Sequence, residues 1–584
     1  MTPAPATSAI NAFRQARFGM FIHWGLYALP GGRWKGEIMD YIGEWLQARF
    51  RIPNAEYARL AERFDPVDFD ADAWVRLAAE AGIRYLVFTT KHHDGFAMYH
   101  SKVSPFNIVD ATPFGRDVLK ELAEACARHG VKLGLYYSHA LDWEDPDGAD
   151  PGPDMHSNFG MSWGNDWEYP ERKKKDFSRY LERKAKPQLK ELLTGYGPIF
   201  TLWFDCPLVI TPEQSAEIRQ WVKSFQPNCL INSRIGHGME DFGSLGDNQR
   251  PTGRSEYPLE SPVTLNKTWG FKWDDDNWVE PRKIACELAT LMDKNVNYLV
   301  NVGPQPDGRF PEASVDILQQ LAQWRKAEQV AIQGAGPNPF AQDFPWGCCT
   351  TTDNGLQLFV TNGQPTLNIH GLLSPVRRAS VPFTQDGDAL TLTLPQSDSL
   401  LPVIHIDCGE PPRVDTRLMP QQGRLDLMPS LAEIRHGEPT KLGKGSNLLG
   451  AAAEKFDVDA PCSLDAGGAL MHWHHPGDKL TWRIYVPEGG CYRISVITEN
   501  QLHSAPWVGG REVAIGFDNQ TLKGCLGEDS VLSTEFYASS LSQVGELEIS
   551  ARTEHVISLE NLAISTPQEA HMNLVALRLE KIES

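Results

Sequence analysis

The ten residues YLVFTTKHHD, numbered 85–94, combine the two features on which the fold assignment rests. Residues 85–90 form a largely apolar run without polar alternation, as expected of a parallel strand that is covered on both faces. The next four residues, Lys91 to Asp94, all carry polar side chains that can take part in chemistry. A buried strand that stops in such a group predicts a functional site at the carboxyl end of a sheet.

The same arrangement recurs along the first 335 residues. Further apolar runs predict strands at 18–24, 132–138, 198–204, 229–233 and 297–302. Amphipathic stretches separate them. Asp70 and Asp117 are placed to cap two of these helices, and Gly82 and Gly130 are placed to end them. Strand, helix and strand at this spacing indicate βαβ units, and therefore either a closed barrel or a doubly wound open sheet.

The residues at the strand ends favour the barrel. Nearly every predicted strand ends in, or is directly followed by, reactive or aromatic side chains, including His23-Trp24, Tyr137-Ser138, Asp205 and Asn232-Ser233-Arg234. In a closed barrel all these ends meet at one mouth, whereas an open sheet would spread them along an edge. We therefore predict an α/β fold, with a (β/α)8-like, TIM-type catalytic barrel over residues 1–336.

Two β-sandwich domains are expected after the barrel. Short strands between turn residues at 356–360, 366–369, 390–394 and 403–406 predict a sandwich that, with its linker, covers 337–430. Residues 480–486 alternate between polar and apolar, and further strands follow at 491–498 and 572–579. They predict a second sandwich over 431–584, similar to a jelly-roll carbohydrate-binding module. Trp473, Trp482 and Trp507 are its candidate sugar-stacking residues.

Composition narrows the choice of partners and compartment. The 584 residues carry a net charge of −20, which repels phosphate backbones and anionic membranes, so we expect neither nucleic acid nor membrane as a partner. No apolar run approaches the roughly 20 residues needed to span a bilayer. The first ten residues do not resemble a signal peptide, which predicts a cytoplasmic protein, or a periplasmic or secreted one if a leader has been removed. An oligomer is compatible with the sequence.

Carbohydrate chemistry suits the strand-end residues. Asp205 follows a buried strand that contains Trp203, and a carboxylate beside an indole at a barrel mouth is a candidate glycosidase nucleophile. His23, His92 and His93 can exchange hydrogen bonds with sugar hydroxyls. The alternative is a metal site in the run His92-His93-Asp94. A glycosidase also needs a second carboxyl group, and the predicted loop 234–269 offers five candidates that pattern alone does not rank: Glu240, Asp241, Asp247, Glu256 and Glu260.

Short motifs in this order resemble the α-L-fucosidases of glycoside hydrolase family 29. They are FGMFIHWG (18–25), EW (44–45), KHHDGF (91–96), YYS (136–138), DW (142–143), WFD (203–205), NSR (232–234), TLNKTWGF (264–271) and NYLVNVGP (297–304). The resemblance implies a retaining enzyme without a cofactor or metal, with Asp205 as the nucleophile. It implies that His23, Glu44, His92 and His93 hold the fucose hydroxyls, that Trp45, Tyr137, Trp203 and Arg234 line the pocket, and that Trp269 packs against the C6 methyl group.

The resemblance also suggests an acid/base residue. Asp247 stands four residues before Pro251, as an acidic residue does in the family, and Glu260 precedes the Thr-Leu-Asn run as another family glutamate does. Relatives usually have Trp before that glutamate, where this chain has Leu259. We prefer Asp247 to Glu260, and Glu260 to Glu256.

The sequence therefore predicts hydrolysis of terminal α-L-fucosyl residues from fucosylated oligosaccharides or glycosides. Retention would require the two carboxyl groups to lie about 5–5.5 Å apart. An α-L-galactosidase is the alternative within this class, because L-galactose adds only a hydroxyl at C6. Two alternatives of other classes are a metal-dependent barrel hydrolase and a non-catalytic sugar-binding protein.

Overall fold

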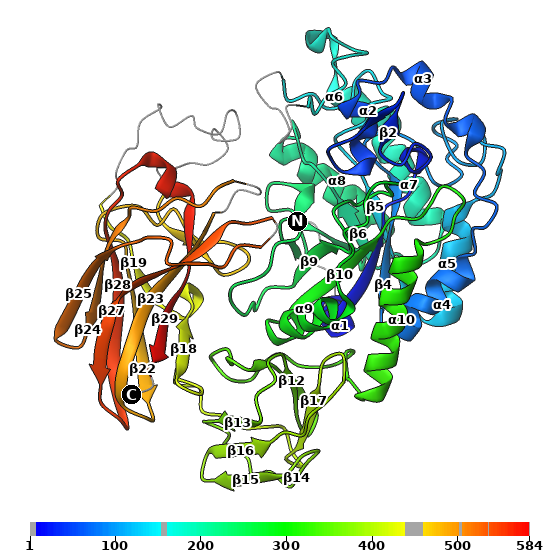
Figure 1. Ribbon diagram of the computed structural model, residues 1–584. Helices are drawn as coiled ribbons and strands as arrows, with labels where there is room; N and C mark the ends of the chain where they lie inside the picture. Colours follow the sequence, from blue (N-terminus) through cyan, green and yellow to red (C-terminus); the bar gives the residue numbers. More distant parts are fainter. Residues whose placement is uncertain (1–6, 153–160, 439–459, 501–504, 535, 583–584) are drawn as a thin grey trace. The chain divides into compact units, whose positions relative to one another are not determined.

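A computed structural model describes residues 7–152, 161–438, 460–500, 505–534 and 536–582 (Figure 1). By its contacts the chain divides into two compact units. The first contains residues 1–247, 257–285 and 297–334, and the second contains 248–256, 286–296 and 335–584. The second unit thus includes two short segments from within the barrel sequence.

Eight parallel strands form the core of the first unit. In chain order they are β1 (Phe18–Ile22), β4 (Tyr85–Lys91), β5 (Lys132–Tyr137), β6 (Thr201–Phe204), β7 (Leu230–Ile231), β8 (Gly243–Ser244), β9 (Leu259–Thr264) and β10 (Val296–Val302). The sheet order is β7-β6-β5-β4-β1-β10-β9-β8. A parallel bridge between Asn232 and Phe242 joins β7 to the start of β8. The ring is therefore closed, which confirms the predicted barrel.

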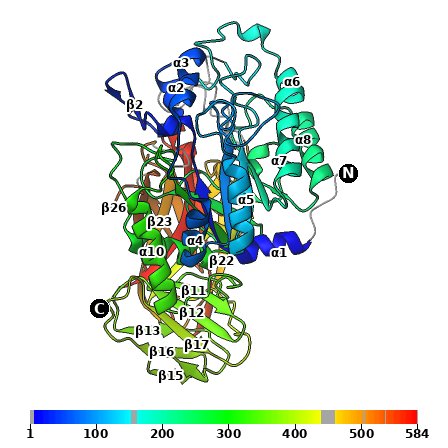
Figure 2. The same cartoon turned by 90° about the vertical axis from the view of Figure 1, so that its right-hand side faces the viewer.

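Ten α-helices are described in this part of the chain. They are α1 (Thr7–Ala16), α2 (Leu46–Arg49), α3 (Asn54–Ala58), α4 (Ala71–Ala81), α5 (Val118–His129), α6 (Phe177–Tyr180), α7 (Lys186–Gly195), α8 (Pro212–Phe225), α9 (Pro281–Asp293) and α10 (Glu312–Ala327). Helices α4, α5 and α10 are neighbours on the outside of the barrel (Figure 2). A small ribbon of β2 (Arg33–Trp34) and β3 (Glu37–Ile38) follows β1.

The predicted caps of α4 and α5 are confirmed. The carboxylate of Asp70 accepts a hydrogen bond from the Ala73 amide, and that of Asp117 accepts one from the Lys120 amide. Gly82 and Gly130 end the two helices in the left-handed conformation, with φ of 98° and 67°. Only glycine adopts this conformation without strain.

The stretch 234–269 differs from the prediction, because it is not one long loop. It contains β8 and β9, which complete the barrel. Strand β9 reads LESPVT, and its Glu and Pro are rare in central strands, so the apolar pattern did not reveal it. Glu260 consequently lies on a barrel strand and is fully buried.

The first β-sandwich consists of two antiparallel sheets. One contains β11 (Gly347–Thr352), β12 (Gly355–Val360), β14 (Arg378–Ala379) and β17 (Val403–Asp407). The other contains β13 (Thr366–Ile369), β15 (Phe383–Asp386) and β16 (Ala389–Thr393). Buried apolar side chains, among them Trp346, Leu358 and Leu392, fill the core between the sheets.

The last β-sandwich also has two sheets. One contains β18 (Arg424–Leu427), β20 (Ser463–Leu464), β21 (Leu470–Met471), β23 (Gly490–Asn500), β26 (Ser530–Val531), β27 (Ser539–Ile549) and β29 (Met572–Lys581). The other contains β19 (Glu433–Arg435), β22 (Lys479–Val486), β24 (Glu512–Phe517), β25 (Gln520–Cys525) and β28 (Thr553–Ala563). Strand β18 pairs with β29, so this sandwich includes part of the predicted linker.

The sugar-stacking role predicted for Trp473 and Trp482 is wrong. Both indoles are buried in the hydrophobic core of the last sandwich, with exposed fractions of 0% and 1%. The indole N–H of Trp482 donates to the main-chain oxygen of Met428. Trp507 is half-buried, and its N–H donates to Thr498 Oγ1. A ring must offer a free face to stack on a sugar, and the two core indoles do not.

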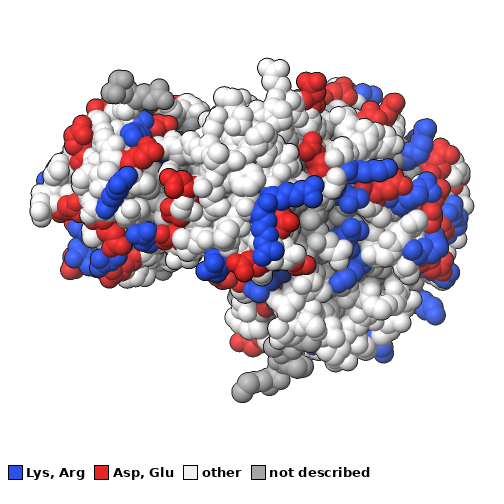
Figure 3. Space-filling view, turned by 90° about the horizontal axis from the view of Figure 1, so that it is seen from below, with Lys and Arg blue, Asp and Glu red and all other residues white. Residues whose placement is uncertain are grey.

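Lysine and arginine side chains are interspersed with aspartate and glutamate on the face shown in Figure 3. Among the described residues, no helix is long and apolar enough to cross a bilayer.

Candidate active site

Asp205 follows β6 at the carboxyl end of the barrel and receives three hydrogen bonds. The hydroxyl of Tyr136 donates to Oδ2 at 3.0 Å, and Arg234 Nη1 and the Cys206 amide each donate to Oδ1 at 2.9 Å. Its side chain keeps 13% of its surface exposed. The carboxylate is therefore rigidly held and still accessible.

Charge around Asp205 keeps it ionised. Burial by itself raises the pKa of this carboxyl group, but the Arg234 guanidinium, His93 and the hydrogen bonds from Arg234 and Tyr136 outweigh it. The pKa lies below its ordinary value as a result. An ionised carboxylate at the mouth of a barrel is what nucleophilic attack on an anomeric carbon requires.

Arg234 joins Asp205 to a second carboxylate. Its Nη2 donates to Asp247 Oδ1 at 2.5 Å, while Nη1 binds Asp205. The guanidinium lies over the Trp203 ring, 4.6 Å from the centroid, which fixes its plane. Two carboxylates bound to neighbouring nitrogens of one guanidinium are close together. The side chain of Asp247 is 41% exposed, so it faces the open side of the site.

The other two acid/base candidates have different surroundings. Glu260 is fully buried, and its carboxylate accepts hydrogen bonds from Tyr85 Oη at 2.6 Å and Trp203 Nε1 at 2.9 Å. Burial raises its pKa to about 7. Glu256 belongs to the second unit, is 83% exposed and pairs with Arg254 at 3.2 Å. Of the three, Asp247 combines an open position with a direct link to the group that holds Asp205.

Three buried histidines stand near Asp205. His23 Nδ1 is 2.7 Å from Asn301 Oδ1, and His93 Nδ1 is 2.7 Å from Ser138 Oγ, with its Nε2 3.7 Å from Asp205. Burial lowers the pKa of His23 and of His93 to about 4, so both rings are neutral at pH 7. A neutral imidazole held through one nitrogen can use the other toward a ligand hydroxyl. In His93 this second nitrogen, Nε2, also lies 3.8 Å from Cys206 Sγ.

His92 has a polar atom that the protein leaves unpaired. Its side chain is buried, and Nδ1 has no hydrogen-bond partner among the described residues. Its ring stacks on Tyr136 with centroids 5.3 Å apart, and it lies 4.2 Å from the His93 ring. A buried nitrogen without a partner costs free energy unless something bonds to it, which points to a ligand.

The remaining predicted pocket residues converge on these histidines. Trp45 meets the His93 ring edge-on at 5.5 Å, and the Trp269 ring lies 5.2 Å from His23. The carboxylate of Glu44 accepts a hydrogen bond from the Gly270 amide at 2.8 Å, next to Trp269. Burial raises the pKa of Glu44 to about 7.

Tyr137 faces away from Asp205, contrary to the role expected for it. Its hydroxyl donates to Gln188 of α7 at 2.8 Å, and Lys91 lies over its ring. Neighbouring residues of a strand point to opposite faces, so Tyr136 reaches Asp205 instead. The sequence predicts that Tyr136 and Tyr137 point to opposite faces of the strand, but it does not show which of them faces the barrel interior.

Asn301 is a second residue that sequence reasoning missed. On β10 it binds His23 and donates through Nδ2 to the Trp269 main-chain oxygen at 2.8 Å. It therefore sets the positions of two predicted pocket residues at once. The only available signal was its place within the NYLVNVGP motif.

The run His92-His93-Asp94 does not form a metal site. The Asp94 carboxylate accepts hydrogen bonds from Tyr57 Oη and the Phe96 amide, so it is directed away from the histidines. Among the described residues, the trios with ligand atoms close enough to share an ion are His93-Asp205-Cys206 and His436-Cys462-Asp478. The first consists of the proposed nucleophile and its neighbours.

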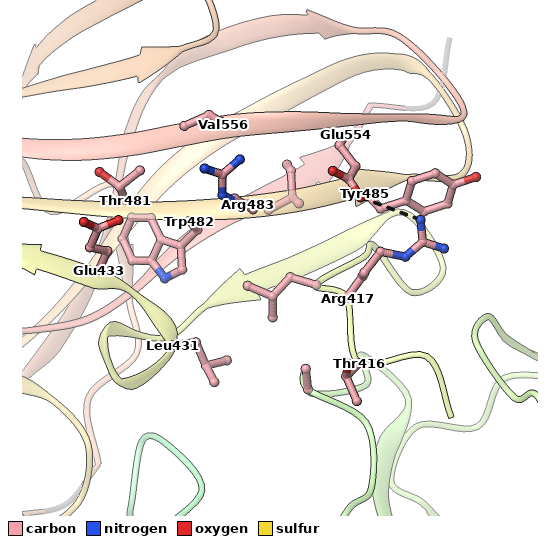
Figure 4. A pocket seen from close by; sticks show the side chains of 13 residues that line it. Thr416, Arg417, Leu431, Glu433, Thr481, Trp482, Arg483, Tyr485, Glu554 and Val556 are labelled. Atoms are coloured by element: carbon pink, nitrogen blue, oxygen red, sulfur yellow. Dashed lines mark ion pairs between the residues drawn. The ribbon is translucent and has the colours of Figure 1, made fainter. Parts of the chain in front are cut away.

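A cavity of about 480 Å³ lies in the second unit, and none of its lining residues comes from the barrel strand ends (Figure 4). Its wall includes Thr481, Arg483 and Tyr485 of β22. The Arg417 guanidinium lies 4.0 Å from the centroid of the Tyr485 ring and covers one of its faces.

Comparison with known proteins agrees with this geometry. Residues 3–329 match the α-L-fucosidase family. Human tissue α-L-fucosidase is 27% identical over 349 residues, which cover 56% of this chain and 69% of that protein. The crystal structure of an α-L-fucosidase from Vibrio sp. strain EJY3 is 27% identical with a TM-score of 0.82, and covers 99% of both chains. The fucose complex of AlfC from Lactobacillus casei is 46% identical with a TM-score of 0.52, and covers 55% of this chain and all of its own.

Proposed function

Because this chain belongs to the α-L-fucosidase family, we propose that it hydrolyses terminal α-L-fucosides with net retention, through a covalent intermediate on Asp205. One observation carries the proposal: an ionised, accessible Asp205 is linked through Arg234 to Asp247 at the barrel mouth. A double-displacement mechanism uses two neighbouring carboxyl groups, one as nucleophile and one as acid/base.

The first step forms a glycosyl ester. An oxygen of Asp205 attacks the anomeric carbon as the bond to the leaving oxygen breaks, and Asp247 gives that oxygen a proton. In the second step Asp247 takes a proton from water, the water oxygen attacks the anomeric carbon, and the ester bond breaks to restore Asp205. Two inversions at one carbon give net retention, and the same residue acts as acid and then as base.

Recognition of the sugar is assigned to the neutral rings and the aromatic wall. His23, His92 and His93 would bond to hydroxyl groups, together with Glu44. Trp269 would pack against the C6 methyl, an apolar group that gains from leaving water. An α-L-galactoside would place a hydroxyl at that indole and lose a hydrogen bond to water, so we expect it to be a poorer substrate.

The substrates are proposed from a relative. AlfC is known in complex with Fucα(1,6)GlcNAc, and its whole length matches 55% of this chain. We propose that fucosylated oligosaccharides of this general kind are substrates here as well. A panel of α(1,2)-, α(1,3)-, α(1,4)- and α(1,6)-fucosides would define the linkage.

Replacement of the nucleophile tests the mechanism. We expect Asp205→Ala to reduce hydrolysis of 4-nitrophenyl α-L-fucoside by at least about 10⁴-fold while the circular dichroism spectrum stays unchanged. Added azide should enter the vacated space and yield β-L-fucosyl azide. Hydrolysis near the wild-type rate would refute the assignment.

Replacement of the acid/base has a different effect. Asp247→Ala should slow fucosyl-oligosaccharides, whose leaving groups need a proton, by about 10²–10⁴-fold, and slow 4-nitrophenyl fucoside less. Azide should then give α-L-fucosyl azide, because the covalent step on Asp205 survives. Glu256→Ala is the matched control, since this exposed carboxylate should leave both substrates unaffected. If Glu260→Ala shows the leaving-group effect and Asp247→Ala does not, the assignment is wrong.

A further inference from the structure

Three side chains of types that commonly bind metal ions meet in the last β-sandwich. His436 directly follows β19, Cys462 directly precedes β20, and Asp478 directly precedes β22. The Cys462 sulfur lies 3.3 Å from His436 Nδ1 and 3.5 Å from Asp478 Oδ1. All three ligand atoms lie within 4.8 Å of one another. The group belongs entirely to the second unit, so its geometry is set within one domain.

The pairing of two strands brings the histidine to the aspartate. Strand β19 runs antiparallel to β22 in a register that, continued by one residue, places His436 opposite Asp478. Side chains of directly opposite residues lie on the same face of a sheet. The Gly437 amide donates to Asp478 Oδ1 at 2.8 Å. A Cβ on Gly437 would lie 2.2 Å from the Pro476 oxygen, so only glycine allows this close approach.

A second histidine holds the cysteine beside the aspartate. His475 Nε2 donates to the Ala460 main-chain oxygen at 3.0 Å, and the His475 amide donates to Asp478 Oδ2 at 2.9 Å. The chain that leads to Cys462 is therefore fastened to the turn that carries Asp478. Cys462 and Asp478 are buried, whereas His436 is exposed. Two ligands are thus fixed inside the protein, and the third faces the solvent from which an ion would enter.

Asp478 is a buried carboxylate, and among the described residues no lysine or arginine forms an ion pair with it. Arg511 lies within reach of its charge but donates to the main-chain oxygens of Trp473 and Glu569 instead. A buried carboxylate is ordinarily paired with a cation or bound to a metal. The surroundings of Asp478 therefore favour a bound cation at this position.

The spacing of the three ligand atoms matches a zinc ion. Zinc binds thiolate sulfur at about 2.3 Å and imidazole nitrogen or carboxylate oxygen at about 2.0–2.2 Å, in tetrahedral geometry. Around one such ion the sulfur lies about 3.5 Å from the nitrogen and from the oxygen. The observed distances of 3.3 and 3.5 Å agree with these values. An ion would therefore fit with only small movements of the side chains.

We propose that His436, Cys462 and Asp478 bind one Zn²⁺ ion, with water as the fourth ligand. Binding releases the thiol proton of Cys462 to the solvent and forms a zinc–sulfur bond. Sulfur and nitrogen ligands favour zinc over calcium and magnesium, which bind oxygen. Strands β19 and β22 belong to one sheet and β20 to the other, so the ion would join the two sheets. Its role is to stabilise the sandwich, and it takes no part in the proposed hydrolysis.

Metal binding to the full-length protein tests the proposal. We expect equilibrium dialysis to show one bound Zn²⁺ per chain, and Co²⁺ in its place to give a sulfur-to-cobalt charge-transfer band. Cys462→Ser should abolish the band and lower the affinity for Zn²⁺ by at least about tenfold. Cys525→Ser is the matched control, because Cys525 is an exposed thiol of the same sandwich and should change neither result. Absence of stoichiometric binding would overturn the proposal, as would a band that is lost in Cys206→Ser instead.

A second variant, His436→Ala, covers the case in which Cys462→Ser does not fold, because this histidine is exposed. Zn²⁺ should raise the melting temperature of the wild-type protein and slow amide hydrogen exchange at residues 460–464, and it should do neither in His436→Ala. Equal protection of the variant, or equal protection by Ca²⁺ or Mg²⁺, would refute the zinc site. Removal of Zn²⁺ with EDTA should leave hydrolysis of 4-nitrophenyl fucoside unchanged, and a loss of activity would contradict the structural role.

Discussion

The Glu260→Gln variant should become more stable relative to the wild type as the pH rises. Glu260 is fully buried on β9, and burial raises its pKa from 4.5 to about 7 in the folded protein. A carboxyl group whose pKa is raised by folding contributes stability that is complete below about pH 4.5 and is lost as the pH rises through 7. Gln has the same shape and no charge to bury. Its oxygen can accept from Trp203, and its amide can donate to the Tyr85 hydroxyl.

The size of the effect follows from the pKa difference. One pKa unit corresponds to about 1.4 kcal/mol, so ionisation of Glu260 costs the wild type about 3 kcal/mol at high pH. About 2 kcal/mol of this cost arises between pH 5.5 and 8. Over that range the unfolding free energy of Glu260→Gln should rise by about this amount relative to wild type. Glu44, whose pKa is also about 7, contributes equally to both proteins.

Calorimetric unfolding of the two proteins at closely spaced pH values measures this difference, with Glu256→Gln as an exposed control. Melting temperatures that stay parallel across the range would refute the reasoning. The same variant bears on the mechanism, because Glu260→Gln should keep near-wild-type discrimination between oligosaccharide and aryl fucoside. A selective loss on the oligosaccharide would make Glu260 the acid/base.

Three further substitutions separate residues that touch the site from those that do not. Tyr136→Phe removes a hydrogen bond to the Asp205 carboxylate, worth about 1.5–3 kcal/mol, and should lower kcat for 4-nitrophenyl fucoside by about 10–100-fold. Tyr137→Phe should leave kcat/KM within about twofold in the same assay, since its hydroxyl bonds to a helix. Asn301→Ala strips His23 of its partner and should raise KM at least about tenfold; an unchanged KM would show that this contact does not orient the ring.

The barrel could be predicted because its signals are local. Continuous apolar runs such as 85–90, helix caps such as Asp70 and polar residues such as Asp205 at strand ends follow from burial, backbone geometry and chain direction. Each can be recognised within a few neighbouring residues. The motif resemblance then added the family, which the family match over residues 3–329 confirms, and the candidate pocket residues.

The features that the sequence could not determine depend on contacts between residues that are far apart in the chain. Strand β9 lacks an apolar run because it contains the buried Glu260. Its carboxylate accepts hydrogen bonds from Tyr85 and Trp203, which are 175 and 57 residues away in the sequence. The same limit applies to Tyr136 and Tyr137, which local pattern treats alike.

The sequence by itself therefore determined the architecture and the chemical class of the site, since strand and helix periods and strand-end residues are properties of short segments. Only the tertiary structure decided which carboxylates are buried and which tyrosine faces Asp205. Burial and hydrogen bonding of these groups depend on which distant segments the fold brings together. The residues next to a carboxyl group in the sequence do not reveal its hydrogen-bond partners.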